Sequence, residues 1–110
     1  MPSKETDIEK KLRIQMGTYQ RLIKEVAAYE KEETMEEQTL ETMKANHDDP
    51  FMIKQQEQVV KETKMMIPDT KTRLQTAFDN LKNLVDMLEA KGGMEENVKF
   101  TEAKNLINSV

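Results

Sequence analysis

The side chains that most often perform chemistry in proteins are scarce in this chain, and their spacing does not assemble a site. The 110 residues include no cysteine and one histidine, His47. The absence of cysteine excludes thiol catalysis, disulfides and cysteine-based zinc sites. Asp48 and Asp49 follow His47, but three adjacent residues in one turn cannot surround a cation, and helix capping explains them better. We therefore expect no metal site.

Carboxylates and arginines are present, but not in a catalytic arrangement. Glu57 and Glu62 belong to no evident apolar pocket, and general acid–base catalysis by paired carboxylates needs one. No glycine-rich phosphate loop is present. A charged site inside a helical bundle would need Arg or Lys at core positions, whereas Arg13, Arg21 and Arg73 all fall beside the expected core seam. We expect no enzyme, no catalytic residue and no bound cofactor.

The composition favours helices and a protein partner. The chain is 36% hydrophobic and 35% charged, with a net charge of −4 and only three glycines and three prolines. A charged fraction above the usual ~25% makes a thick core unlikely to form, and the abundant Glu, Lys, Gln, Met and Leu favour helix. No apolar run approaches the ~20 residues of a membrane span. The net negative charge argues against binding to nucleic acid or to anionic membranes. We therefore expect a cytosolic protein that binds another protein.

The hydrophobic periodicity predicts three helices, in residues 6–45, 50–91 and 95–108. Thr6 and Glu9 fit a capping box at the first start. Asp49 and Pro50 suit the second start, and Gly92-Gly93 suits its end. The second helix has the clearest pattern, a seven-residue repeat of Ile53, Val60, Ile67, Leu74, Leu81 and Leu88.

The other apolar residues complete the expected seams. In the second helix Val59, Phe78 and Val85 broaden the stripe. Met66 of this helix and Met43 of the first helix are interpreted as core filler near the seams. The first seam lapses at Gln15, Glu33 and Glu36, and otherwise consists of Ile8, Leu12, Tyr19, Leu22, Val26, Tyr29, Leu40 and Met43. The third consists of Val98, Ala103, Leu106, Ile107 and Val110.

These lengths predict the fold class: all-α, an elongated antiparallel three-helix bundle of the spectrin or coiled-coil kind. At 1.5 Å per residue, each long helix measures roughly 60 Å and the third about 20 Å. Short connections make neighbours antiparallel, so the third helix should fold back along the second and end near Leu74. Residues 29–66 would then form a two-helix arm with a weak seam. We expect a single domain over residues 1–110.

Proline in the middle of the second helix predicts a kink there. Pro68 cannot donate a hydrogen bond to the carbonyl of Lys64, and its ring clashes with that turn, at a cost of about 3 kcal/mol. Two interpretations stay open. The bend is either a tolerated curvature of a long surface helix or a shape that matches a curved partner.

Eight residues of the expected arm are candidates for binding a partner. Residues 30–41 hold six Glu and one Lys, which is either a solvated face near Lys61 and Lys64 or an acidic patch that attracts a basic surface. Met35 and Met65 fall on outward positions; single exposed apolar residues are ordinary, but methionine also suits adaptable binding surfaces. The candidates are Glu32, Met35, Glu36, Glu37, Lys61, Lys64, Met65 and Asp69.

Two stretches of the second helix are specific enough to suggest a family. They are Ile53-Lys54-Gln55-Gln56-Glu57 and Lys64-Met65-Met66-Ile67-Pro68-Asp69. Together they resemble the tubulin-binding cofactor A family, also called tubulin-specific chaperone A. Arg21-Leu22-Ile23-Lys24-Glu25 and Tyr29-Glu30-Lys31-Glu32 resemble its first helix, and Thr101-Glu102-Ala103-Lys104 its third. The turn at Gly92-Gly93-Met94 and residues 1–4 depart from the family pattern.

This resemblance implies a function. It implies a monomeric cytoplasmic protein, associated with the cytoskeleton, that binds quasi-native β-tubulin after the cytosolic chaperonin and hands it on towards assembly with α-tubulin. No nucleotide or metal is implied. Two alternatives stay open, a homo-oligomeric coiled-coil scaffold and a general helical-hairpin holdase. A stable dimer in sedimentation equilibrium would favour the scaffold. Selective recovery of β-tubulin, rather than of many clients, would exclude the general holdase.

Overall fold

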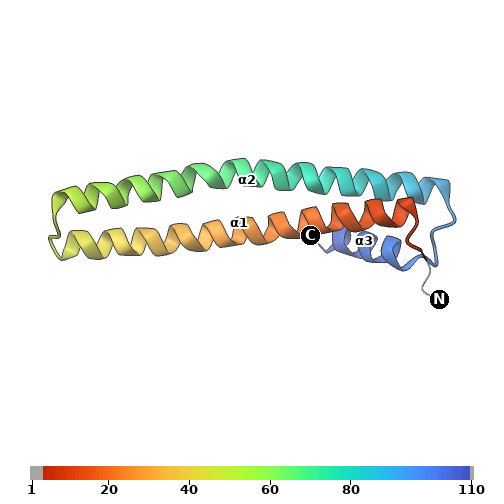
Figure 1. Cartoon of the computed structure of the whole chain (residues 1–110), viewed down its shortest axis with the longest axis horizontal. Helices are drawn as coiled ribbons and strands as arrows, with labels where there is room; N and C mark the ends of the chain where they lie inside the picture. The colour runs from red at the N-terminus through yellow and green to blue at the C-terminus, as the bar shows by residue number, and fades with distance from the viewer. Residues whose placement is uncertain (1–3, 110) are drawn as a thin grey trace. The chain divides into compact units, whose positions relative to one another are not determined.

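Three helices make up the fold in the computed structural model, which describes residues 4–109. They are α1 (Asp7–Ala45), α2 (Pro50–Lys91) and α3 (Val98–Asn108), and the described residues form no strand (Figure 1). The expected all-α class, with two long helices and a shorter third, is confirmed. Val110, expected in the last apolar stripe, lies outside the described residues. Within residues 4–109, no helix combines the length and apolarity needed to cross a bilayer.

Both long helices begin with the caps that the sequence predicts. The Thr6 N–H donates to Glu9 Oε1 over 3.0 Å, and the Glu9 N–H donates to Thr6 Oγ1 over 3.1 Å, which is a reciprocal capping box. At the start of α2, the Phe51 N–H donates to Asp49 Oδ1 over 2.8 Å. Pro50 occupies the first helical position, where a missing N–H costs nothing. Local sequence therefore fixes both starts.

The turn between α1 and α2 closes around a residue with left-handed backbone. His47 has a φ of 53°. Its N–H donates to the Lys44 carbonyl over 3.1 Å, and the Asp48 N–H donates to the Met43 carbonyl over 3.0 Å. These are the paired bonds of a Schellman motif, which ends a helix. No group of three or more His, Cys, Asp or Glu in the described part of the chain is placed to hold a metal ion.

The start of α3 differs from the expected one. The helix begins at Val98 rather than at residue 95, because the Asn97 side chain accepts the N–H of Phe100 over 3.0 Å and acts as the cap. The expected stripe was wrong at Val98, which is 69% exposed, and it omitted Phe100, which is 6% exposed. With the helix starting at Val98, its buried face consists of Phe100, Ala103 and Ile107.

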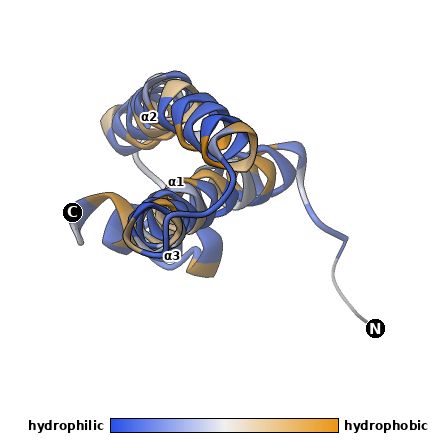
Figure 2. Ribbon diagram, turned by 90° about the vertical axis from the view of Figure 1, so that its left-hand side faces the viewer, coloured by the Kyte–Doolittle hydropathy of each residue, from blue (hydrophilic) through white to orange (hydrophobic). Residues whose placement is uncertain are grey.

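The chain divides into two compact units, which we describe separately. The three-helix unit consists of the described residues up to Leu22 together with those from Arg73 onward, and the hairpin unit is Ile23–Thr72. Each helix alternates hydrophobic and hydrophilic stretches along its ribbon (Figure 2). The prediction of a single domain over 1–110 stays a prediction. The core of the three-helix unit comprises Leu12, Met16, Tyr19, Leu22, Ala77, Leu81, Leu84, Val85, Leu88, Phe100, Ala103 and Ile107.

The third helix widens this core beyond the expected seam. Met16 is buried although it lies beside the predicted seam of α1, because a helix that packs against two neighbours buries a broader face. Ile8, in the first turn of α1, was expected in the seam but is 41% exposed. Leu74 and Leu106 pack against the core while remaining partly buried. The expectation that the third helix ends near Leu74 stays a prediction.

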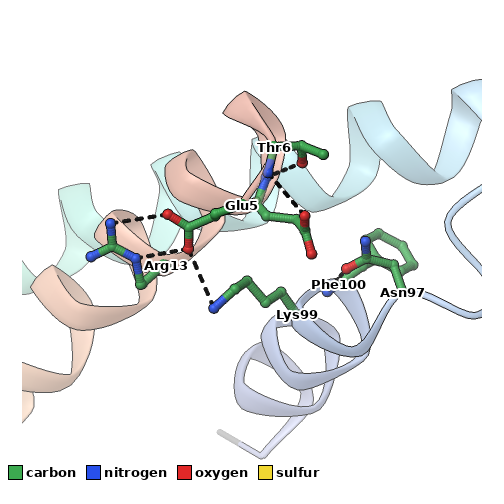
Figure 3. Close-up of polar contacts among 7 residues, drawn as sticks. Glu5, Thr6, Arg13, Asn97, Lys99 and Phe100 are labelled. Atoms are coloured by element: carbon green, nitrogen blue, oxygen red, sulfur yellow. Dashed lines mark hydrogen bonds and ion pairs between the residues drawn. The ribbon is translucent and has the colours of Figure 1, made fainter. Parts of the chain in front are cut away.

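Charged residues add a second connection between the start of α1 and α3 (Figure 3). Arg13 donates from Nε and Nη2 to the Glu5 carboxylate over 2.9 and 3.1 Å, and Lys99 Nζ lies 3.5 Å from the same group. The hydrogen bond from Arg13, followed by its charge and by Lys99, holds the pKa of Glu5 below the ordinary 4.5. Hydrogen bonds from Thr6 likewise lower the pKa of Glu9.

The hairpin unit has a narrower and more polar seam. Val26, Val60 and Ile67 are its buried apolar residues, and Thr63 and Thr70 are buried beside them. The Thr70 hydroxyl donates to the Met66 carbonyl over 2.9 Å, which satisfies its polar group within the helix. The expected weak seam of the two-helix arm is therefore seen in the burial pattern.

Helix α2 continues as one helix through Pro68. Because proline has no N–H, the carbonyl of Lys64 lacks its helical donor. The Thr72 hydroxyl donates to the Pro68 carbonyl over 3.0 Å, so the turn after the proline carries an additional bond. The kink expected near Pro68 stays a prediction.

We predict that Gly17→Ala stabilises the chain. Gly17 lies inside α1, and a Cβ built on it meets no atom within 4 Å. Alanine should raise the free energy of unfolding by about 0.5–1 kcal/mol by restricting the unfolded backbone without strain. Urea denaturation followed by circular dichroism measures the change. Gly92→Ala is the matched control: its surroundings are equally open, but its φ is +76°, so alanine should cost about 1 kcal/mol. A loss of stability in Gly17→Ala would contradict the prediction.

A second prediction concerns acid stability. A lowered pKa means that the Glu5 contacts stabilise the fold above the unfolded value and that this contribution is lost as the pH falls through the folded value, below about 4.5. Glu5→Gln should therefore lower the thermal midpoint at neutral pH and show a smaller further drop on acidification than the unmodified chain. Thermal unfolding across this pH range is the measurement, with Glu41→Gln as an exposed control. Parallel pH profiles for Glu5→Gln and the unmodified chain would exclude this role.

Candidate partner-binding surface

All eight candidate residues lie in the hairpin unit, but on different faces of it. Three of them line one hollow, two pair with each other, and three are exposed on α2. The first group is Glu32, Met35 and Glu36; the second is Glu37 and Lys64; the third is Lys61, Met65 and Asp69. The sequence prediction therefore combined residues that the fold separates.

One side of the hairpin carries a row of ion pairs between α1 and α2. The shortest joins Lys64 Nζ to Glu37 Oε1 over 2.9 Å, and this hydrogen bond raises the pKa of Lys64. Part of the acidic run is thus a paired, solvated face: Lys64 hydrogen-bonds to Glu37, and the charge of Glu33 acts on the same ammonium group. We call this side the ionic flank: Glu37–Lys64, Glu30–Lys71 at 3.5 Å, and Lys44–Glu57 at 3.8 Å.

The other side of α1 has a hollow centred on Met35. The hollow has a volume of about 380 Å³, and Met35 also lines a neighbouring hollow of about 340 Å³. Met35 is 58% exposed, so a large part of its side chain is available for contact. The lining of the first hollow is Ala28, Lys31, Glu32, Met35, Glu36 and Thr39.

Two carboxylates of this hollow are adjacent to each other. A hydrogen bond with Glu36, together with partial burial and the repulsion between the two groups, raises the pKa of Glu32. Glu36 Oε2 is buried and has no hydrogen-bond donor in the described structure. Lys31 contributes a cation to the lining. The hollow thus contains two neighbouring acids, one of which has an unsatisfied acceptor.

The sequence prediction did not identify a row of exposed apolar residues on the surface of α2. Val59 and Met66 were expected to broaden the seam or fill the core, but they are 40% and 45% exposed, so that expectation was wrong. With the exposed Met52 they recur every seven residues, each one position before a residue of the apolar repeat. The residues of α2 that form ion pairs each lie four positions after a residue of the apolar repeat. In a seven-residue pattern, the position one before a repeat residue and the position four after it border the seam on opposite sides. We call Met52, Val59 and Met66 the methionine flank.

The sequence and the fold both match one family over most of the chain. The family model described as tubulin binding cofactor A matches residues 7–107. The chain belongs to this family. Tubulin-specific chaperone A of Rattus norvegicus is 36% identical over 101 residues, which cover 92% of this chain and 91% of the relative. Among solved structures, tubulin folding cofactor A from Arabidopsis thaliana aligns with a TM-score of 0.81 at 35% identity, covering 93% of this chain and 94% of that one. The human tubulin chaperone cofactor A gives 0.75 at 31%, covering 93% and 96%.

Membership in the tubulin-binding cofactor A family confirms the resemblance seen in the motifs of α2. It makes the chain a tubulin chaperone cofactor and not an enzyme. The match extends over all three helices, from the first residue of α1 to Ile107 of α3. It does not distinguish among the eight candidate contacts, which stay a proposal.

The ionic flank generates a prediction about Glu37 and Lys64. Glu37→Lys should lower the thermal midpoint because it places a cation beside Lys64, and adding Lys64→Glu should restore it by reversing the pair. Both effects should be small and should shrink in high salt, because the side chains are exposed. Thermal unfolding at two salt concentrations measures them. A double variant no more stable than the single one would show that the two charges do not interact.

Proposed function

We propose that this member of the tubulin-binding cofactor A family captures quasi-native β-tubulin after its release from the cytosolic chaperonin and hands it on towards assembly with α-tubulin. Family membership supports tubulin as the client. The observation that carries the proposal is the surface of the hairpin unit. Exposed methionines and the acidic hollow at Met35 lie on sides of the two helices other than the one with the row of ion pairs. Such a surface binds without chemistry.

Methionine side chains suit a client that is not fully folded. They are unbranched and polarizable, so they adapt to irregular apolar surfaces. Met35, Met52 and Met66 are all about half exposed on the hairpin. Covering apolar surface of a newly released subunit in this way would oppose its aggregation. The surrounding charges would favour association with a complementary client over self-association.

The polar seam of the hairpin supports the same proposal. Thr63 and Thr70 occupy positions where the three-helix unit has buried apolar residues, so fewer apolar contacts hold the hairpin together. A hairpin held in this way can adjust its side chains to a client at lower cost than a fully packed core. We infer a monomeric protein that acts in the cytoplasm and is associated with the cytoskeleton through its client.

The test is selective binding by the unmodified chain. β-Tubulin released from purified cytosolic chaperonin is mixed with the chain and analysed on native gels, with α-tubulin and actin released in the same way as controls. We expect a complex with β-tubulin alone and transfer of β-tubulin into heterodimer when the remaining assembly factors and α-tubulin are added. Equal binding of all three clients would instead support a general holdase. A stable dimer of the free chain in sedimentation equilibrium would support a scaffold.

A further inference from the structure

We infer that the hollow at Met35 is the anchoring site for the client, and that it takes a lysine or arginine side chain flanked by apolar residues on a helix of the bound tubulin chain. This inference rests on the proposed function and narrows the eight candidate contacts to the three that share one hollow. The three are Glu32, Met35 and Glu36.

The apolar part of the site consists of side chains at helical spacing. Ala28, Met35 and Thr39 present methyl and methylene groups along one face of α1, and the hollow there measures about 380 Å³. A second hollow of about 340 Å³ shares Met35, so the methionine lies between two depressions on the same helix. Two depressions joined by a flexible apolar side chain fit successive turns of a partner helix, whose residues recur every three or four positions.

The charged part of the site points to a cation on that helix. Glu32, which is exposed, and Glu36, which is half-buried, stand on successive turns of α1 and both line the hollow, so two like charges lie close together. An ammonium or guanidinium group from a partner can approach the exposed Glu32 carboxylate and offset the repulsion between the two acids. Lys31 also lines the hollow, so the two acids outnumber the cation there.

A second copy of the chain and a metal ion both fit this hollow less well. A second copy docked symmetrically would bring a second Glu32–Glu36 pair towards the first, and like charges at an interface oppose binding. A metal ion needs three or more donor groups, and residues 4–109 contain no cluster of three or more His, Cys, Asp or Glu. A basic, partly apolar helix satisfies the acceptors and the apolar surface together.

Site-directed crosslinking tests the position of the anchor. The chain has no cysteine, so Met35→Cys introduces a single attachment point for a benzophenone maleimide. Irradiation of the labelled chain with chaperonin-released β-tubulin should yield one main crosslinked peptide, from a helix with a Lys or Arg beside apolar residues. Met87→Cys is the matched control, since Met87 is 51% exposed but belongs to the three-helix unit, and it should crosslink at least tenfold less.

Three crosslinking outcomes would overturn the inference. One is equal crosslinking from Met87→Cys, which would show contact without preference for the hollow. Another is stronger crosslinking from Met65→Cys, which would assign the anchor to the exposed side of α2. The third is a crosslinked peptide with no basic residue. Each of these requires that β-tubulin binds, so each would leave the proposed function intact.

Glu36→Gln tests the charged part and separates binding from folding. The amide can donate to Glu32 and removes the repulsion, so the thermal midpoint should rise. β-Tubulin affinity should nevertheless fall about tenfold, because the cation loses one of its two acids. Glu41→Gln, an exposed acid on the same helix, should change both quantities little. A more stable Glu36→Gln chain with unchanged affinity would overturn the inference, and failure of the unmodified chain to bind would instead refute the proposed function.

Discussion

The seven-residue apolar repeat of α2 is the constraint on which the rest of the structure depends. It sets which side of α2 faces α1. It therefore also determines which two positions of each repeat border the seam. In the three-helix unit one of these borders is apolar, with Met16 on α1 and Phe78 and Val85 on α2. The ring centroid of Phe78 lies 5.7 Å from that of Tyr19. Three seven-residue repeats further along α1, the position equivalent to Met16 is Glu37, which is paired with Lys64. The same helical position therefore offers packing surface to α3 in one unit and ion pairs in the other.

This change of residue type also changes the energetics of the seam. Thr63 and Thr70 are succeeded at the same repeat position by Ala77 and Leu84. Burying a leucine contributes roughly 1.5–3 kcal/mol, whereas a buried threonine must first satisfy its hydroxyl, as Thr70 does by donating to the Met66 carbonyl. Exposed ion pairs contribute little stability of their own. The ionic flank therefore specifies the pairing of the two helices more than it strengthens it, and the hairpin unit relies on a few apolar residues.

Sequence reasoning succeeded where a local rule decides the structure. The capping box of Thr6 and Glu9, the Asp49 cap and the helix end at Gly92 each depend on neighbours within a few residues, so spacing alone predicts them. It failed where a distant helix decides burial. Periodicity alone did not show that α3 would cover Met16, or that Val59 and Met66 would lie beyond the reach of α1. The eight candidate contacts were chosen by outward position, but only the fold shows that Glu37 is used internally while Glu32, Met35 and Glu36 share a hollow.

Two buried side-chain oxygens in the described residues have no donor, Gln15 Oε1 in the three-helix unit and Glu36 Oε2 in the hairpin unit, and Glu36 differs in standing beside a second acid, Glu32. A buried carboxylate oxygen without a donor is unfavourable, and native structures contain few of them. The neighbouring residue Glu37 makes the ion pair with Lys64, so that link between the two helices does not depend on the Glu36 carboxylate. Positions that break a local rule without a compensating contact tend to be functional. The conflict is eased if a partner brings a cation to the exposed Glu32 carboxylate, because that charge offsets the repulsion between the two acids.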